Sequence, residues 1–201
     1  MEDSKKTQKS MNNLKVEDCM KEELGKYLSQ DPDINRILEI VKDLDLADSW
    51  ICAGTIRNFI WNHYRFDKNT DVDLIFYDEQ VSHQATKELE ANLRQRYPEY
   101  QWEVKNQVFM HIHSPDTSPY RSSKDAIEKF PERCTAIGVR QTEKGDIELF
   151  APYGLTDIYK YLVRPTPHFI ANSKRMYLYK ERIKKKNWKK QWSKITIKYE
   201  E

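Results

Sequence analysis

The sequence has few cysteines, and their arrangement does not suit a disulfide framework or a zinc site. The chain of 201 residues contains three, Cys19, Cys52 and Cys134. Their number is odd, they are widely spaced, and no CxxC pair occurs. Because disulfide scaffolds and structural zinc sites need paired cysteines, we expect free thiols and a reducing, cytoplasmic location.

Long hydrophobic runs are also absent. A membrane-spanning helix takes about 20 apolar residues, and no run approaches that length. The first residues, MEDSKKTQKSMNN, are polar and no apolar segment follows them, so no secretory signal is expected. Charged residues make up 33% of the chain and the mean hydropathy is -0.89. The composition therefore predicts a soluble protein that does not bind membranes.

The length and composition favour one folded domain. Aromatic residues make up 12% of the chain, which is too many for a disordered protein. A chain of 201 residues can bury one proper core, whereas two full domains are not expected. We predict disorder for residues 1–14 and a single domain over residues 15–201, with a basic C-terminal helix.

Positive charge is concentrated near the C-terminus. Residues Lys174 to Lys198 contain eleven Lys or Arg and one acid, for a charge of +10, so the remainder sums to -8 within a net charge of +2. This asymmetry suggests a polyanionic partner, and the interleaved aromatic residues suit contact with nucleic acid. The alternative is an amphipathic helix that packs Trp188 and Trp192 against the sheet and leaves its lysines in solvent.

Hydrophobic periodicity and capping residues predict helices alternating with strands, then a hairpin. Helices are expected over about residues 16–28, 34–41, 56–64, 81–97, 124–130 and 156–164, followed by the basic helix. Strands are expected at 49–53, 71–77, 101–113, 136–141 and 147–150. The pattern predicts an α+β fold in which helices pack on a mixed sheet.

Two acids stand at the head of one predicted strand. Asp71 and Asp73 are two residues apart, so their side chains share a face of the strand. Carboxylates this close repel one another unless a cation lies between them. Mg²⁺ prefers such oxygen ligands and completes its shell with water and substrate phosphates.

A small-residue turn upstream supplies groups that bind anions. Gly54 and Thr55 precede a predicted helix, whose first backbone N–H groups would be free to bind phosphate. Arg57 follows in the first turn and could add charge-assisted hydrogen bonds. Metal ligands beside a phosphate site together predict a binding site for a nucleoside triphosphate.

These elements resemble a known family. The run Ala-Gly-Thr-Ile-Arg-Asn (53–58), then Thr-Asp-Val-Asp-Leu (70–74), is similar to the head of the CCA-adding and poly(A) polymerases, within the DNA polymerase β-like nucleotidyltransferase superfamily. The resemblance is closer to a compact bacterial nucleotidyltransferase-like group. It includes Lys-Asn-Gln (105–107), Met-His (110–111), Ala-Pro-Tyr-Gly-Leu (151–155) and Arg-Pro (164–165), and so covers about residues 32–192.

The resemblance implies a polymerase β-like fold and a set of acidic metal ligands. Asp71, Asp73 and a third acid would hold two Mg²⁺ ions, with Mn²⁺ as a substitute. The third acid falls best on Glu103, which lies between Trp102 and Val104, and Glu148 is its rival. Glu103 would also be catalytic as the base that takes a proton from the acceptor.

The remaining candidate residues concern the nucleotide. Gly54, Thr55 and Arg57 would bind the phosphates. The amides of Asn106 and Gln107 could read a base or ribose, or could instead hold the end of the sheet together.

Two functions are consistent with this sequence. The first is an enzyme that transfers a nucleoside monophosphate from an NTP to an RNA, protein or small-molecule acceptor. The second is a nucleotide- or RNA-binding module on the same fold that has no turnover.

Overall fold

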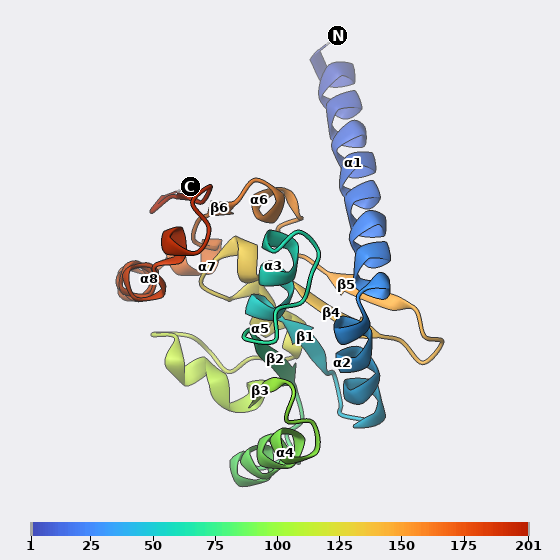
Figure 1. Ribbon diagram of the computed structural model, residues 1–201. Coiled ribbons are helices and arrows are strands. Elements are labelled where there is room, and N and C mark those ends of the chain that lie inside the picture. The colour runs from blue at the N-terminus through green and yellow to red at the C-terminus, as the bar shows by residue number, and fades with distance from the viewer. Residues whose placement is uncertain (1, 201) are drawn as a thin grey trace.

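The protein is built on a β-sheet, which the computed structural model in Figure 1 shows among the helices. A large hydrophobic cluster forms on one face of the sheet and a smaller one on the other. The structure describes the backbone of residues 2–200 and the side chains of residues 15–200. Within these residues the main sheet has five strands in the order β3-β2-β1-β4-β5. They are Gln101–Asn106 (β3), Asp71–Phe76 (β2), Trp50–Cys52 (β1), Gly138–Gln141 (β4) and Ile147–Phe150 (β5). Of the neighbouring strands in this sheet, β2 and β3 pair in parallel and the others pair antiparallel, so the predicted mixed sheet is confirmed.

The helices begin at capping residues that the sequence provides. Helix α2 (Pro32–Asp43) follows Asp31, whose Oδ1 accepts a hydrogen bond from the backbone N–H of Ile34 at 2.9 Å. Helix α4 (His83–Arg96) follows Ser82, which caps the helix in the same way. The other helical segments are α1 (Glu2–Gln30), α3 (Ala53–Trp61), η1 (Gln107–His113), α5 (Ser123–Glu128), η2 (Arg133–Thr135), α6 (Thr156–Tyr159), α7 (Pro167–Ile170), α8 (Ser173–Lys186) and η3 (Trp188–Lys190).

The two faces of the sheet bury different groups. On β2, Val72, Leu74 and Phe76 face the large hydrophobic core, together with residues of α1, α2 and α3. Asp71, Asp73 and Ile75 alternate onto the other face, where a smaller cluster forms around Trp50, Cys52, Ile75, Ile127 and Ala136. Burial of each large apolar side chain contributes about 1.5–3 kcal/mol. A slip of one residue would bury both aspartates instead, so this pattern fixes the register.

The predicted strand over residues 101–113 is too long. Strand β3 ends at Asn106, and residues Gln107–His113 form the 3₁₀ helix η1. The side chain of Asn106 accepts a hydrogen bond from the backbone N–H of Val108 at 3.3 Å. This local bond turns the chain out of the sheet.

Helix α1 is longer than the sequence pattern predicts. It includes the expected residues 16–28 but begins at Glu2 and projects away from the rest of the molecule (Figure 1). The backbone of residues 2–14 is helical here and their side chains lie outside the described residues, so disorder of residues 1–14 stays a prediction. Across residues 2–200, no helix combines the length and the apolar character that crossing a membrane requires.

The C-terminal segment packs against α3. Helix α8 is followed by η3 and by a short strand, β7 (Thr196–Ile197), which pairs with β6 (Leu162–Val163). Trp188 and Trp192 are buried, and their rings lie 6.3 and 5.1 Å from that of Trp61 on α3. The expectation that these tryptophans pack inward is confirmed, although their partner is a helix rather than the sheet.

Candidate active site

A cavity of about 330 Å³ opens on the less covered face of the sheet. Strands β1, β2 and β3 form its floor, and the start of α3, the segment before η2 and the inward side of α8 form its walls. The lining residues are Cys52, Ala53, Gly54, Arg57, Asn58, Thr70, Asp71, Asp73, Ile75, Glu103, Lys105, Gln107, Met110, Phe130, Pro131, Thr135, Arg182 and Lys186.

The three predicted carboxylates meet at this cavity. The parallel pairing of β2 with β3 places Asp73 opposite Glu103, and Asp71 opposite Gln101 one step along the same face. All three carboxylates line the cavity. The strand of Glu103 therefore neighbours that of the two aspartates, while the chemical role of Glu103 stays a prediction.

Asp73 occupies the anion site at the start of α3. Its Oδ2 accepts hydrogen bonds from the backbone N–H groups of Gly54 at 2.8 Å and Thr55 at 3.3 Å. The expectation that these N–H groups are free is wrong, because a carboxylate of the protein itself already binds them. Their affinity for an anion is nevertheless evident, since the N-terminus of a helix attracts negative charge.

Glycine is required at position 54 by close approach. A Cβ atom on Gly54 would lie 2.9 Å from Asp73 Oδ2, which is too near for an undisturbed contact. The left-handed backbone of this turn belongs instead to Ala53, with φ of 50°. An alanine in that region is strained, and such strain is common at functional sites.

The hydroxyl of Thr55 fixes the strand rather than opening to the cavity. Thr55 is fully buried, and its Oγ1 donates to the carbonyl of Asp71 at 2.9 Å and accepts from the N–H of Asp73 at 2.7 Å. Both hydrogen bonds hold the start of β2 against α3. The hydroxyl thereby positions the two aspartates.

The environment of Asp73 favours a bound cation. Burial, together with the charge of Glu103, raises the pKa of Asp73 from 3.8 to about 6, although Arg57 and the two N–H donors favour its charged form. Among residues 15–200, no three His, Cys, Asp or Glu side chains converge closely enough in this conformation to hold a metal ion. The carboxylate oxygens of Asp71, Asp73 and Glu103 are nevertheless the type of ligand that Mg²⁺ prefers. Mg²⁺ commonly binds only one or two carboxylates and completes its shell with water and phosphate oxygens.

Arg57 is buried beside the turn and stacked on tryptophans. Only 5% of it is exposed, so it is not a solvated residue of the helix surface. Its Cζ lies 4.3 Å from the ring centre of Trp188 and 5.1 Å from that of Trp61. Its Nε and Nη2 donate to Asn58 Oδ1 at 3.1 and 2.7 Å. Burial lowers the pKa of Arg57, but stacking on electron-rich rings stabilises its charge.

The two predicted amides differ in their surroundings. Asn106 Oδ1 accepts from the N–H groups of Asp78 and Val108, and its Nδ2 donates to the carbonyls of Asp78 and Val81. All of these hydrogen bonds are to the protein backbone, which favours the alternative that Asn106 holds the end of the sheet together rather than contacting a nucleotide. Gln107 lines the cavity, and its Nε2 donates to the carbonyl of Lys105 at 3.3 Å.

Glu148 lies away from the aspartates. It sits on β5, at the opposite edge of the sheet from β3, and pairs with Lys124 at 3.0 Å and Arg140 at 2.6 Å. These partners lower the pKa of Glu148 despite its partial burial. Its surroundings are those of a structural ion pair.

Several residues that line the cavity were not predicted from the sequence. Lys105 follows Glu103 on the same strand face and pairs with it at 3.4 Å. Arg182 and Lys186 reach the cavity from α8, although the sequence suggested only a basic surface there. A signal lay in their spacing, since Arg182 and Lys186 each follow a buried residue of α8, Tyr179 or Ile183, by three positions.

Comparison with known proteins identifies the family and the fold. The profile of a family described as Nucleotidyltransferase matches residues 39–197. An NMR structure that reveals a CCA-adding enzyme head domain is 51% identical, with a TM-score of 0.83, covering 88% of this chain and 95% of that one. A CCA-adding enzyme in complex with ATP has the same fold at 10% identity and a TM-score of 0.52, covering 87% of this chain and 42% of that one. No curated protein matches. The chain therefore belongs to this nucleotidyltransferase family and has the polymerase β-like fold of the CCA-adding enzyme head domain.

Proposed function

We propose that the protein is a metal-dependent nucleotidyltransferase. It transfers a nucleoside monophosphate from an NTP to an acceptor: an acceptor oxygen or nitrogen forms a bond to the α-phosphorus, the bond from that phosphorus to the β-phosphate oxygen breaks, and pyrophosphate leaves. The acceptor's proton passes to a base. Family membership supports the reaction class, and the site supports the chemistry.

One observation carries the proposal. Asp73 and Glu103 are paired across parallel strands at a cavity that also holds Asp71, and the anion-binding start of α3 forms the adjoining wall. Acidic ligands beside an anion site suit a cation and a phosphate chain together.

Asp71, Asp73 and Glu103 would hold two Mg²⁺ ions, for which Mn²⁺ could substitute. When bound, these ions would neutralise phosphate charge and lower the pKa of the attacking group. The side chain of Glu103 is 44% exposed, which suits the base that accepts a proton from an incoming acceptor.

The start of α3 would bind the triphosphate. The N–H groups of Gly54 and Thr55 are the donors, and Arg57 adds positive charge at the same turn. Gln107 would contact the base or ribose, with Asn106 holding the strand end behind it. Entry of a phosphate requires Asp73 to release the two N–H groups.

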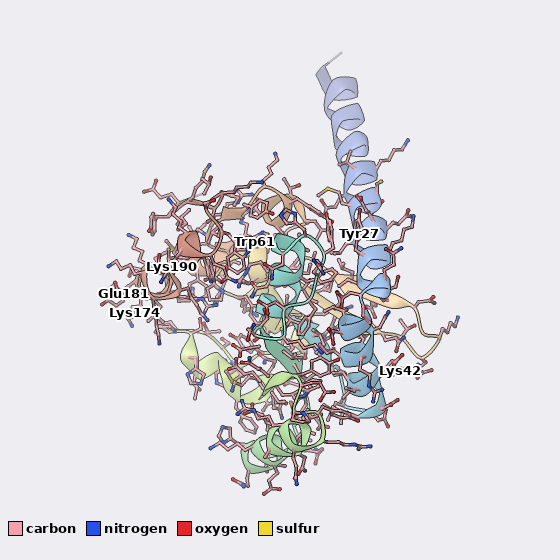
Figure 2. All side chains as sticks on the ribbon, viewed as in Figure 1. Tyr27, Lys42, Trp61, Lys174, Glu181 and Lys190 are labelled. Carbon is pink, nitrogen blue, oxygen red and sulfur yellow. The ribbon has the colours of Figure 1, made fainter. Side chains whose placement is uncertain are left out.

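The acceptor is an RNA, a protein or a small molecule. The basic segment Lys174–Lys198 offers a surface to a polyanion, and Figure 2 shows Lys174 and Lys190 on the same side of the molecule, away from Lys42. Phosphate recognition by such a segment supports a nucleic-acid contact.

Label transfer tests this function. The protein would be incubated with Mg²⁺, cell extract and each NTP labelled at the α-phosphate, and the products separated into RNA, protein and small molecules. Transfer of label that is lost in Asp71→Asn/Asp73→Asn supports the enzyme and identifies the acceptor class. Binding of NTP without transfer would instead support the alternative, a nucleotide- or RNA-binding module without turnover.

A further inference from the structure

We infer that the inward side of α8 belongs to the nucleotide site, where Arg182 and Lys186 bind the β- and γ-phosphates of the NTP. The inference rests on the proposed function and names further ligands for it. It gives the basic helix a role that differs from contact with an acceptor.

The geometry of α8 brings these two side chains to the cavity. Tyr179 and Ile183 are buried on the inward side of the helix. Arg182 and Lys186 are four residues apart, one turn of the helix, and both line the cavity. The two preceding lysines differ from Lys186, since Lys184 pairs with Glu181 at 2.7 Å and Lys185 does not line the cavity.

Arg182 is held by a buried carboxylate. Glu132 is fully buried, its Oε1 accepts from Arg182 Nε at 2.7 Å, and its Oε2 accepts from Thr135 Oγ1 at 2.8 Å. The charge of Glu132 raises the pKa of Arg182. A guanidinium fixed in this way, at the edge of a cavity, is preorganised to contact an anion.

Lys186 is held in place by the end of the helix. Asn187, next in the chain, ends α8 in the left-handed conformation with φ of 42°. Trp188 then packs into the body, where its ring contacts Arg57. Lys186 therefore lies two residues before Trp188, the buried residue that stacks on Arg57, and this packing anchors its backbone.

The arrangement of charge favours a triphosphate over an acceptor. Arg57 and Arg182 line the same cavity as Asp73, and its negative charge favours the charged form of both, although burial lowers the pKa of Arg57 overall. Both cations are thus on the side of the phosphate-binding turn. Lys186 is one helical turn from Arg182, and Gly54, Arg57, Arg182 and Lys186 all line the cavity, so three positive charges border the space that a triphosphate would occupy.

The test compares adjacent lysines. Binding of Mg-ATP, Mg-ADP, AMP and adenosine would be measured by calorimetry for the wild type, Lys186→Ala and Lys185→Ala. Losing a charge-assisted hydrogen bond weakens binding by roughly 10-fold or more. We expect that loss for ATP with Lys186→Ala, a much smaller effect on AMP, none on adenosine, and wild-type affinities for Lys185→Ala.

Arg182 is tested by Arg182→Lys, because Arg182→Ala would leave Glu132 buried and unpaired. We expect weaker ATP binding with unchanged adenosine binding, since lysine keeps the charge but lacks the planar guanidinium. Wild-type ATP affinity in both Lys186→Ala and Arg182→Lys would overturn the inference, as would equal losses for adenosine and ATP.

The outcomes separate this inference from the proposed function. ATP binding that depends on Lys186, without any label transfer, would sustain the phosphate site and reject the enzyme. Label transfer by the wild type, together with an ATP affinity that changes in neither Lys186→Ala nor Arg182→Lys, would support the enzyme and reject the phosphate site. A Lys186→Ala variant that binds ATP normally but needs more acceptor would assign the lysine to the acceptor and overturn the inference.

Discussion

At the scale of single residues, the site is defined by a few close contacts around Asp73. Its carboxylate is bound by the turn at Gly54, faces Glu103 across the strands, and has a pKa raised to about 6. Each of these contacts responds in a different way to substitution.

The first prediction concerns metal and nucleotide. Asp71→Asn/Asp73→Asn should abolish Mg²⁺-dependent NTP binding without lowering the melting temperature. The pKa of Asp73 is higher in the folded state than its ordinary 3.8, so its ionised form destabilises the fold at pH 7 and a neutral amide does not. Calorimetric titration and thermal melts in EDTA would measure both effects. Wild-type affinity for Mg-NTP in the double variant would reject the metal site.

The second prediction concerns Gly54. Gly54→Ala would put a Cβ 2.9 Å from Asp73 Oδ2 and push the carboxylate off the two N–H groups. Leaving such groups without partners costs about 1–3 kcal/mol, which chemical denaturation would measure. Ala53→Gly is the control, since it relieves a left-handed alanine and should not destabilise the protein. An equal loss of unfolding free energy in Gly54→Ala and Ala53→Gly would show that any substitution in the turn destabilises the protein, and would contradict a specific role for the contact with Asp73.

At the scale of secondary structure, the pairing of strands decides which acids can act together. Strand β3 lies beside β2, whereas β5 lies at the other edge of the sheet. The site therefore depends on the parallel pairing that follows α4, and not on the hairpin.

The third prediction follows from this order. Glu103→Gln should spare NTP affinity and lower the transfer rate by roughly 10²–10⁴-fold, as expected for loss of a general base. Glu148→Gln should leave transfer unchanged, because Glu148 is paired with Lys124 and Arg140 on β5. Single-turnover transfer assays would compare the two variants. A larger loss in Glu148→Gln would move the catalytic role to that residue.

The sequence predicts elements well where local signals agree. Asp31 and Pro32 start α2, Ser82 starts α4, and two-residue alternation defines β2. The predicted strand after Tyr100 is too long because the strand ends at a side-chain hydrogen bond of Asn106, and such a bond does not change the hydrophobic periodicity.

The candidate site was predictable only in part. The glycine turn and the two aspartates belong to consecutive elements, α3 and β2, so their order along the chain predicts that they lie close together. The occupation of the N–H groups by Asp73, the burial of Arg57 under Trp188 and the entry of Arg182 from α8 all depend on tertiary packing. Residues 73 and 182 are far apart in the chain, and no local pattern reports that they share a cavity.

At the scale of the whole molecule, acid stability combines opposing groups. His168 accepts or donates bonds with Ser114 and Thr117 and lies near Arg175. Burial, aided by the charges of Arg175 and Lys129 and opposed by that of Asp125, lowers the pKa of His168 from 6.5 to about 4.

The fourth prediction concerns this histidine. As pH falls from about 6.5 toward about 4, the unfolded chain gains a proton on His168 that the folded protein does not, so the fold loses stability. His168→Gln should show a smaller loss over this range in urea melts, and NMR titration should place the imidazole pKa below 6.5. Below about pH 6 the folded protein gains a proton on Asp73 before the unfolded chain does, so Asp73 stabilises the fold as pH falls. A parallel variant without Asp73 would remove this opposing effect. An unshifted imidazole titration would contradict the prediction.

The contact between the turn at Gly54 and the carboxylate of Asp73 also constrains evolution. Nineteen positions separate these residues, yet the space available to one is set by the other. A side chain at position 54 becomes acceptable only when position 73 is shortened or its carboxylate moves away. Across related chains, the two positions should therefore change together, and a glycine at 54 should accompany an aspartate at 73.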